Sequence, residues 1–514
     1  MRLGNQLCVV SYAQALIIER FGSNPAVRYL DSYLADLKAT SVLIETKYVD
    51  RHFLDDYAEH YARTFSPPPP HCERWHFFAG TTAGTLATRL RRGLRSCKAR
   101  KQQTELLQQH YLGYVCRRPI PDATLGRTVL RTYDIAGGRR NYSVVRDYRV
   151  NLAGFELVVQ GLAFQQQDGG AAVCASTALW SAFQQVARLT GARTPTPIAV
   201  TRASGSPFPP SHGLGLDEMA SAISAFGFGA DEFARVENSG LFRAQLLSFL
   251  RSELPVVVFL AGKVNSETSR IERLGHAVTV TGYASPTSET IDLAGQKIRL
   301  RGAGADVVYV HDDNLGSHAH YELRMHATIA EDGAVAERLV LFRGDQLKPK
   351  VDWWTPDAWV VSGAIVPRPS KIRMPIEQLY QLLGDFQNLI RQLIHLLGAP
   401  QALCETFANA VTFDAYYGSG IAVQRALTGD GFAVADVVRA QMNVTLPRYV
   451  SLVEVSYRER VLLRLVYDAS ALVQHQRRRP LLFVCPSVAR PTELGVIFAA
   501  AADHYQACVV FARQ

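Results

Sequence analysis

Apolar side chains recur at three- and four-residue steps in the first part of the chain, for example at Phe53, Tyr57 and Tyr61. This spacing places them on one face of a helix. Four consecutive prolines, Pro67–Pro70, then exclude both a helix and a central strand. We therefore predict a helical N-terminal region over residues 1–75.

The pattern changes after residue 111 to short alternating runs separated by Gly and Pro, which predict strands. A helical pattern begins at Cys174 and ends before Gly191. Alternating strands follow, of which Gly275–Tyr283 and Asp306–Gly316 are the clearest. Because helices and strands occur in separate blocks, the fold class is expected to be α+β.

These changes of pattern divide the chain into four parts. After the helical N-terminal region comes a basic linker or helix at residues 76–110. Residues 111–368 are expected to form the main domain, with the short strands as an N-terminal β extension. Residues 369–514 combine helical segments with a predicted antiparallel hairpin, so we expect a C-terminal α+β domain.

The segment before the helix at Cys174 presents a thiol in a chemically useful position. Three glutamines, Gln165–Gln167, and a Gly-Gly turn lead directly into the cysteine. In the first turn of a helix, unpaired N–H groups and the positive end of the dipole favour a thiolate and can hold an oxyanion. Cys174 is therefore a candidate nucleophile.

Two later strands supply the partners that a thiol nucleophile needs. His276 lies on the strand Gly275–Tyr283, and Asp312 and Asp313 lie at the exit of the next long strand. Nucleophile, base and orienting carboxylate together form a hydrolase triad. Strand alternation places Asp312 on the same face as Val308 and Val310, and it places Asp313 on the opposite face. We therefore expect Asp312 to orient His276, with Asp313 as the alternative.

The order of these motifs resembles that of the papain-like cysteine peptidases. Within that family, it is most similar to the bacterial peptidase domains that process bacteriocin leader peptides. The residues that carry the resemblance are the glutamines, the Cys174 helix, the run His-Ala-Val-x-Val-x-Gly-Tyr from His276, and the strand that ends at Asp312. It covers about residues 160–320 and leaves both ends of the chain outside.

The resemblance implies a papain-like core, in which a helix carrying the cysteine packs on an antiparallel sheet carrying the histidine and the aspartate. It also implies cleavage of a peptide or isopeptide bond through a thioester acyl-enzyme, without a metal or an organic cofactor. A glutamine usually stands six residues before the cysteine to hold the oxyanion, but here that position is Asp168. Gln167 is then the preferred donor.

Two other functions use the same residues differently. An amine that resolves the thioester would make the chain an acyltransferase of the transglutaminase kind. A papain-like scaffold without activity would instead bind a protein partner. The presence of Cys174, His276 and Asp312 together favours an enzyme acting on a peptide or protein substrate.

The overall composition bears on the class of protein and on its expected location. The 514 residues are 48% hydrophobic, which is enough for large buried cores, and no run of about 18 apolar residues indicates a membrane span. The eight cysteines are scattered without the spacing of a disulfide framework or a zinc finger. A reducing cytoplasm is the expected location.

The net charge of +9 is partly local. Seven cations occur within thirteen residues that contain no acid: Arg89, Arg91, Arg92, Arg95, Lys98, Arg100 and Lys101. Apolar residues recur at helical spacing through the same segment. A basic amphipathic helix of this kind can meet nucleic acid, an acidic protein or a membrane surface, so Arg89–Lys101 is a candidate site for an anionic partner, although most such runs are solvated faces.

Overall fold

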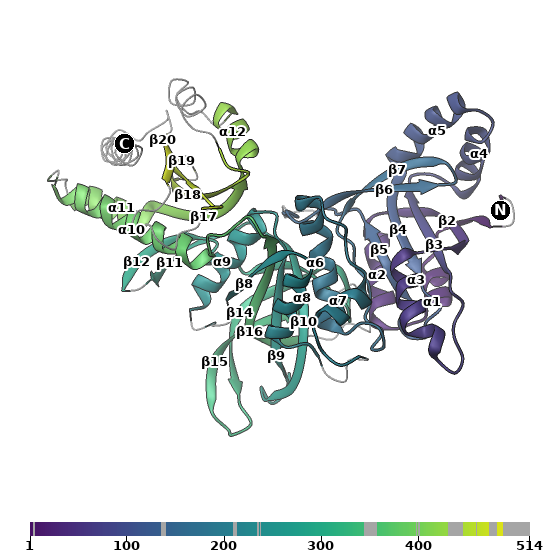
Figure 1. Ribbon diagram of the computed structural model, residues 1–514, viewed down its shortest axis with the longest axis horizontal. Helices are drawn as coiled ribbons and strands as arrows, with labels where there is room; N and C mark the ends of the chain where they lie inside the picture. The colour runs from purple at the N-terminus through teal and green to yellow at the C-terminus, as the bar shows by residue number, and fades with distance from the viewer. Residues whose placement is uncertain are drawn as a thin grey trace. The chain divides into compact units, whose positions relative to one another are not determined.

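The computed structural model describes the chain except for residues 4–5, 135–139, 209–212, 234–235, 237, 294, 344–356, 397, 399–400, 430–445, 459, 472–480 and 487–514. The described part contains helices and predominantly antiparallel sheets (Figure 1), so the predicted α+β class is confirmed. No helix among these residues is long and apolar enough to cross a membrane. The chain divides into two compact units.

Unit 1 comprises residues 1–234, 253–284 and 307–367, and it begins with an antiparallel five-stranded sheet. The strands, in their order across the sheet, are β1 (Leu7–Ser11), β2 (Ala39–Tyr48), β3 (Cys72–Ala79), β4 (Tyr111–Arg117) and β5 (Leu125–Leu130). The helical segments between them are α1 (Gln14–Phe21), α2 (Pro25–Asp36), α3 (Arg51–Glu59), the short 3-10 helix η1 (Tyr61–Arg63), α4 (Ala83–Gly93) and α5 (Cys97–His110). A separate hairpin, β6 (Arg146–Leu152) and β7 (Phe155–Gly161), follows.

The prediction of a wholly helical region at residues 1–75 is wrong, because β1, β2 and the start of β3 lie there. The helical spacing at Phe53 and Tyr57 does belong to a helix, α3. The run that forms β2 carries Val42, Ile44 and other β-branched residues, and pairing with β3 fixes it as a strand. That pairing joins residues about 30 positions apart, so local periodicity did not reveal it.

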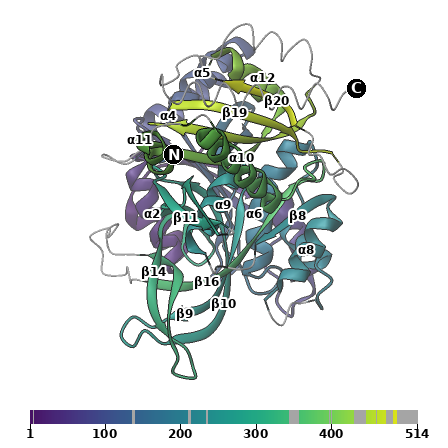
Figure 2. The same cartoon turned by 90° about the vertical axis from the view of Figure 1, so that its left-hand side faces the viewer.

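The second sheet of unit 1 has seven strands in the order β15-β14-β13-β10-β9-β16-β8. Their bounds are β8 (Phe228–Phe233), β9 (Val256–Val264), β10 (Ile271–Tyr283), β13 (Val307–Asp312), β14 (Gly316–Ile329), β15 (Val335–Arg343) and β16 (Asp357–Pro369). Because β15 also pairs with β16, the strands from β15 to β16 close into a ring, and β9, β10, β14 and β16 lie together (Figure 2). The helices of this part are α6 (Cys174–Thr190), α7 (Pro197–Ala203) and α8 (Leu216–Ala225).

Unit 2 comprises residues 235–252, 285–306 and 368–514, so it takes two segments from within the range expected to form the main domain. Its six-stranded sheet has the order β11-β12-β17-β18-β19-β20. The strands are β11 (Ser288–Leu293), β12 (Gln296–Arg301), β17 (Val411–Ser419), β18 (Tyr449–Tyr457), β19 (Arg460–Asp468) and β20 (Leu481–Pro486), and the helices are α9 (Ser239–Arg251), α10 (Ile376–Leu396), α11 (Gln401–Ala410) and α12 (Gly420–Gly429).

Helix α6 is buried, and it packs on the strands β9, β10 and β13 and on the helices α7 and α8. All its residues from Ala175 to Ala187 are buried, which fits a sequence rich in alanine and large apolar residues. It packs on β10, where the Thr279 hydroxyl donates a hydrogen bond of 2.8 Å to the Ala178 carbonyl. The position of Cys174, the first residue of α6, is therefore fixed relative to β10.

A second contact ties α6 to α3. The Trp180 indole N–H donates a hydrogen bond of 3.0 Å to His52 Nδ1, and both side chains are buried. Burial lowers the pKa of His52 to about 3, so the imidazole is neutral and can accept this bond. The helix that carries Cys174 is thus anchored through a histidine that must stay uncharged.

This anchor predicts an acid-sensitive contribution to stability. Below pH 6.5 the unfolded chain protonates His52, whereas the folded chain resists protonation until about pH 3. Stability is therefore lost as pH falls through this window. In His52→Asn, which keeps an acceptor, the loss of unfolding free energy between pH 7 and pH 4.5 should be smaller by about 2 kcal/mol. Urea denaturation at both pH values measures it. The exposed His395→Asn is the matched control, and equal pH dependence in wild type and His52→Asn would contradict the anchor.

Candidate active site

The loop that delivers Cys174 makes a tight turn before α6. Gly169 has a positive φ of 70°, which favours glycine. Gly170 lies so close to His60 that a Cβ would come within 2.6 Å of its Nε2. These contacts explain why two glycines precede the cysteine. Cys174 itself is half-buried, and as the first residue of the helix its N–H has no acceptor within the helix.

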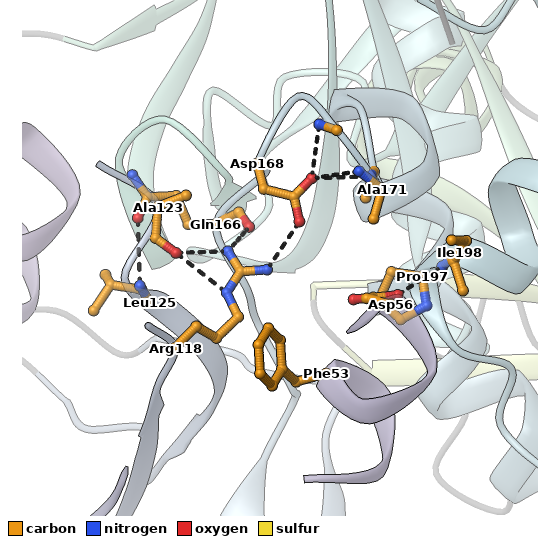
Figure 3. Close-up of polar contacts among 12 residues, drawn as sticks. Phe53, Asp56, Arg118, Ala123, Leu125, Gln166, Asp168, Ala171, Pro197 and Ile198 are labelled. Carbon is orange, nitrogen blue, oxygen red and sulfur yellow. Dashed lines mark hydrogen bonds and ion pairs between the residues drawn. The ribbon is translucent and has the colours of Figure 1, made fainter. Parts of the chain in front are cut away.

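Asp168 organises the same loop (Figure 3). Its Oδ1 accepts hydrogen bonds of 2.9 to 3.0 Å from the N–H groups of Gly170, Ala171 and Ala172. Its Oδ2 lies 3.3 Å from Nη1 of Arg118, a buried side chain that also donates to the Gln166 carbonyl at 2.7 Å. Asp168, at the position where a glutamine would be expected, therefore shapes the backbone before Cys174.

His276 of β10 is buried and has hydrogen-bond partners on two other elements. Its Nε2 lies 3.0 Å from Asp312 Oδ1, and a second hydrogen bond joins the imidazole to Cys174. Burial lowers the pKa of His276, but Asp312, the bond to Cys174 and the charge of Asp313 outweigh burial, so the pKa is raised well above its usual value. The structure thus brings together the three residues that the sequence singled out.

Asp312 is held firmly in this arrangement. Its Oδ1 accepts from the Asn314 N–H at 3.0 Å, and its Oδ2 accepts a short bond from the Tyr321 hydroxyl. Burial raises the pKa of Asp312, but the charge and hydrogen bond of His276, followed by the other donors, lower it to about 2. The Trp359 ring lies 5.4 Å from the His276 ring, between centroids, and covers it. Asp312 is therefore ionised at neutral pH.

Asp313 lies on the same side as Asp312, so the prediction that it faces away is wrong. Its Oδ1 is 3.6 Å from His276 Nε2. The register of β13 against β14 shifts between Val310 and Asp312, which breaks the strict alternation of sides. Both Asp313 oxygens are buried, and the hydrogen-bond donors nearest to them are the backbone N–H groups of Asp313 and Asn314. Burial is the largest influence on Asp313 and raises its pKa. The charge of His276 lowers the pKa and the charge of Asp312 raises it, and the result is a pKa of about 7.

Gln167, the preferred oxyanion donor, is half-buried at the edge of this group. Its Nε2 donates at 3.4 Å to the Asn314 amide oxygen. The Asn314 amide nitrogen lies 3.4 Å from His276 Nε2, so Asn314 bridges Gln167 and the imidazole. The sequence argument missed Asn314, although it directly follows the two aspartates. It also missed Arg118, Tyr321 and Trp359, which are distant in sequence and carry no local motif.

The other cysteines whose side chains are described lie in different surroundings. Cys72 and Cys116 are buried, and burial raises the pKa of each well above its usual value. Cys97 is exposed on α5, and Cys8 is half-buried on β1. Among the described cysteines, Cys174 is the one that shares a hydrogen bond with a histidine.

The same cluster also contains the one group of potential metal ligands found among the described residues. The ligand atoms of His276, Asp312 and Asp313 lie within 4.8 Å of one another. A metal bound there would compete for the imidazole of His276 and the carboxylate of Asp312, which are hydrogen-bonded to each other. It would also compete with the hydrogen bond between the imidazole and Cys174.

No protein-family model matches this chain, and no curated protein matches it significantly.

The Arg118–Asp168 pair predicts a large effect of one substitution. Asp168→Ala should lower the free energy of unfolding by about 3 to 5 kcal/mol, because it removes the acceptor of three N–H groups and leaves a buried guanidinium without its carboxylate. Urea denaturation measures the loss. Asp147→Ala, at an exposed position of β6, is the control and should change stability by less than about 0.5 kcal/mol. A loss below about 1 kcal/mol for Asp168→Ala would contradict this role.

The unequal contacts of the two aspartates predict unequal effects on His276. Asp312→Asn should lower the pKa of His276 more than Asp313→Asn does, because Asp312 contributes both charge and a hydrogen bond. A histidine-selective NMR titration, with His276→Gln to assign the resonance, measures both shifts. A larger drop in Asp313→Asn would show that Asp313 is the main partner.

Proposed function

We propose that this chain is a cysteine-peptidase-like thiol hydrolase with a papain-like core. The observation that carries the proposal is the chain of contacts Cys174, His276 and Asp312, in which a thiol at a helix start shares a hydrogen bond with an imidazole held by a buried carboxylate. The cysteine helix packs on an antiparallel sheet that carries the other two residues, as a papain-like core requires.

The contacts of His276 support its role as the base that activates Cys174. Because Asp312 holds Nε2, the other imidazole nitrogen, Nδ1, faces Cys174 in this proposal. The pKa of His276 is raised well above its usual value, and in this proposal the imidazole accepts the thiol proton of Cys174 as the general base. Asp312, ionised in its buried site, stabilises the positive imidazole.

The reaction follows from these states. The Cys174 thiolate attacks a peptide or isopeptide carbonyl carbon, and the carbonyl electron pair moves to its oxygen. The N–H of Cys174 and the side-chain amide of Gln167 donate to this oxyanion. His276 then gives its proton to the leaving amine as the C–N bond breaks, which leaves a thioester. His276 then takes a proton from water, and the resulting hydroxide attacks the thioester carbonyl carbon. The C–S bond breaks, the Cys174 thiolate leaves, and the carboxylic acid is released with the proton still on His276, which restores the starting pair.

The proposed substrate is therefore a peptide or a protein with an accessible amide bond. An amine in place of water at the last step would give acyl transfer, and the identity of the released product distinguishes the two. Because the thiol must remain reduced, we propose that the reaction takes place in a reducing compartment such as the cytoplasm.

The proposal predicts that Cys174 reacts faster than the other described cysteines. Near neutral pH, iodoacetamide should alkylate Cys174 at least about tenfold faster than Cys97, since the imidazolium raises its thiolate fraction. Peptide mapping by mass spectrometry at timed quenches measures each rate.

Two variants serve as controls for this measurement. His276→Ala should slow alkylation of Cys174 and leave that of exposed Cys97 unchanged, because of these two cysteines Cys174 is the one that contacts His276. Cys97→Ser should leave the rate at Cys174 unchanged. Equal rates at Cys174 in wild type and His276→Ala would refute the pair.

A further inference from the structure

The two helices α4 and α5 form a basic surface in unit 1 that the proposed reaction does not use. We call this helical pair the basic hairpin; it lies beside β6 and β7 (Figure 1). Five of its cations are exposed: Arg91, Arg92, Arg95, Lys98 and Lys101. Arg89 and Arg100 are half-buried in the same surface.

Among the described residues, none of the cations of the basic hairpin belongs to an ion pair. The segment from Thr81 to Thr104 contains no acid, and the one acid of α5, Glu105, is exposed four residues after Lys101. Buried nitrogens of Arg89 and Arg100 also lack a hydrogen-bond partner. Concentrated like charge without compensation repels itself, so an anionic partner would relieve it.

Packing fixes which side of the basic hairpin faces outward. The apolar side chains of α4, Leu86 and Leu90, are buried, and Gly93 packs directly against Phe155 of β7. Gln108 of α5 exchanges two hydrogen bonds, of 2.7 and 2.8 Å, with the backbone of Val158. Ser96 caps the N-terminus of α5, with its Oγ 3.2 Å from the Ala99 N–H. The cations are therefore presented on a rigid outer face.

The chemistry of that face narrows the class of partner. Between Thr81 and Thr104 its polar side chains are donors from Arg, Lys, Thr, Ser and Gln, and one carboxylate, Glu105, is exposed further along α5. This excess of donors matches the acceptor-only oxygens of phosphodiesters. No aromatic residue occurs between Thr81 and Gln109, so the stacking that holds single-stranded bases is missing. One large apolar side chain, Leu94, is exposed on the hairpin, which is too little for the apolar face of a membrane-bound helix.

We propose that the basic hairpin binds the phosphate backbone of duplex nucleic acid without reading its sequence. The cations neutralise successive phosphates, and their contacts are the same for any base sequence. This activity is separate from the thiol chemistry and does not depend on it. DNA and RNA duplexes share the phosphodiester backbone that the surface would contact.

The test measures binding of the full-length protein to a fluorescent duplex of about 20 base pairs, or two helical turns, by anisotropy. If the five exposed cations all contact phosphates, a plot of log K against log salt between about 50 and 200 mM should have a slope of about −4.5. The variant Arg91→Gln, Arg92→Gln, Arg95→Gln, Lys98→Gln should bind about 100-fold more weakly, or worse, at the lower salt. Glutamine keeps these helical positions compatible with a helix.

The matched control removes the same number of charges elsewhere, at the exposed Arg20, Lys47, Arg270 and Lys371, each replaced by Gln. It should keep most of the affinity. Circular dichroism checks that both variants fold, and unchanged alkylation of Cys174 in the hairpin variant separates this proposal from the proposed function.

Parallel arms use duplex DNA, duplex RNA, vesicles containing phosphatidylserine, and polyglutamate. Stronger binding to either duplex than to vesicles and polyglutamate supports the proposal, and the preferred duplex identifies the natural ligand class. The proposal is overturned if wild type binds no duplex, if vesicles or polyglutamate bind as tightly, or if the control variant loses as much affinity as the hairpin variant.

Discussion

The hydrogen bond between His276 and Asp312 is the interaction on which the account of the site depends. A buried imidazolium is costly unless a carboxylate compensates it, and Asp312 provides that compensation at 3.0 Å. The same imidazole is hydrogen-bonded to Cys174, so a shift of α6 relative to β10 would break the second contact. Three contacts keep α6 and the loop before it in place, so that Cys174 stays beside His276. They are the Thr279–Ala178 bond, the Trp180–His52 bond and the Arg118–Asp168 pair.

Three ionisable groups lie close together at this site, and their pKa values differ because their partners differ. Asp312 accepts from His276, Asn314 and Tyr321 and stays ionised, whereas burial and the charge of Asp312 raise the pKa of Asp313 to about 7. Two full negative charges beside one imidazolium would leave one charge uncompensated in a buried site. Because the pKa of Asp313 is raised to about 7, protonation of Asp313 near neutral pH lowers the cost of the uncompensated charge.

The sequence predicted those parts of the molecule in which local pattern and chemistry coincide. The Cys174 helix, the strand of His276 and the strand ending at Asp312 were visible because each combines a regular period with an unusual polar residue. Strands β1 and β2 were not predicted, because their extended conformation depends on pairing between segments that are distant in the sequence. The side on which Asp313 lies depends on a register shift at the strand end, which the alternation of residues does not predict. Arg118, Tyr321 and Trp359 contact the site from other elements, so no motif near Cys174, His276 or Asp312 indicates them.

The central claim is that Cys174 forms a covalent acyl-enzyme, and intact-mass spectrometry tests it most directly. The full-length protein is mixed with an activated peptide ester, quenched in acid and digested to locate the adduct. The account predicts a mass increase equal to the acyl group, located on Cys174, reversed by hydroxylamine and absent in Cys174→Ala. An adduct on another residue, or an equal adduct in Cys174→Ala, would contradict it.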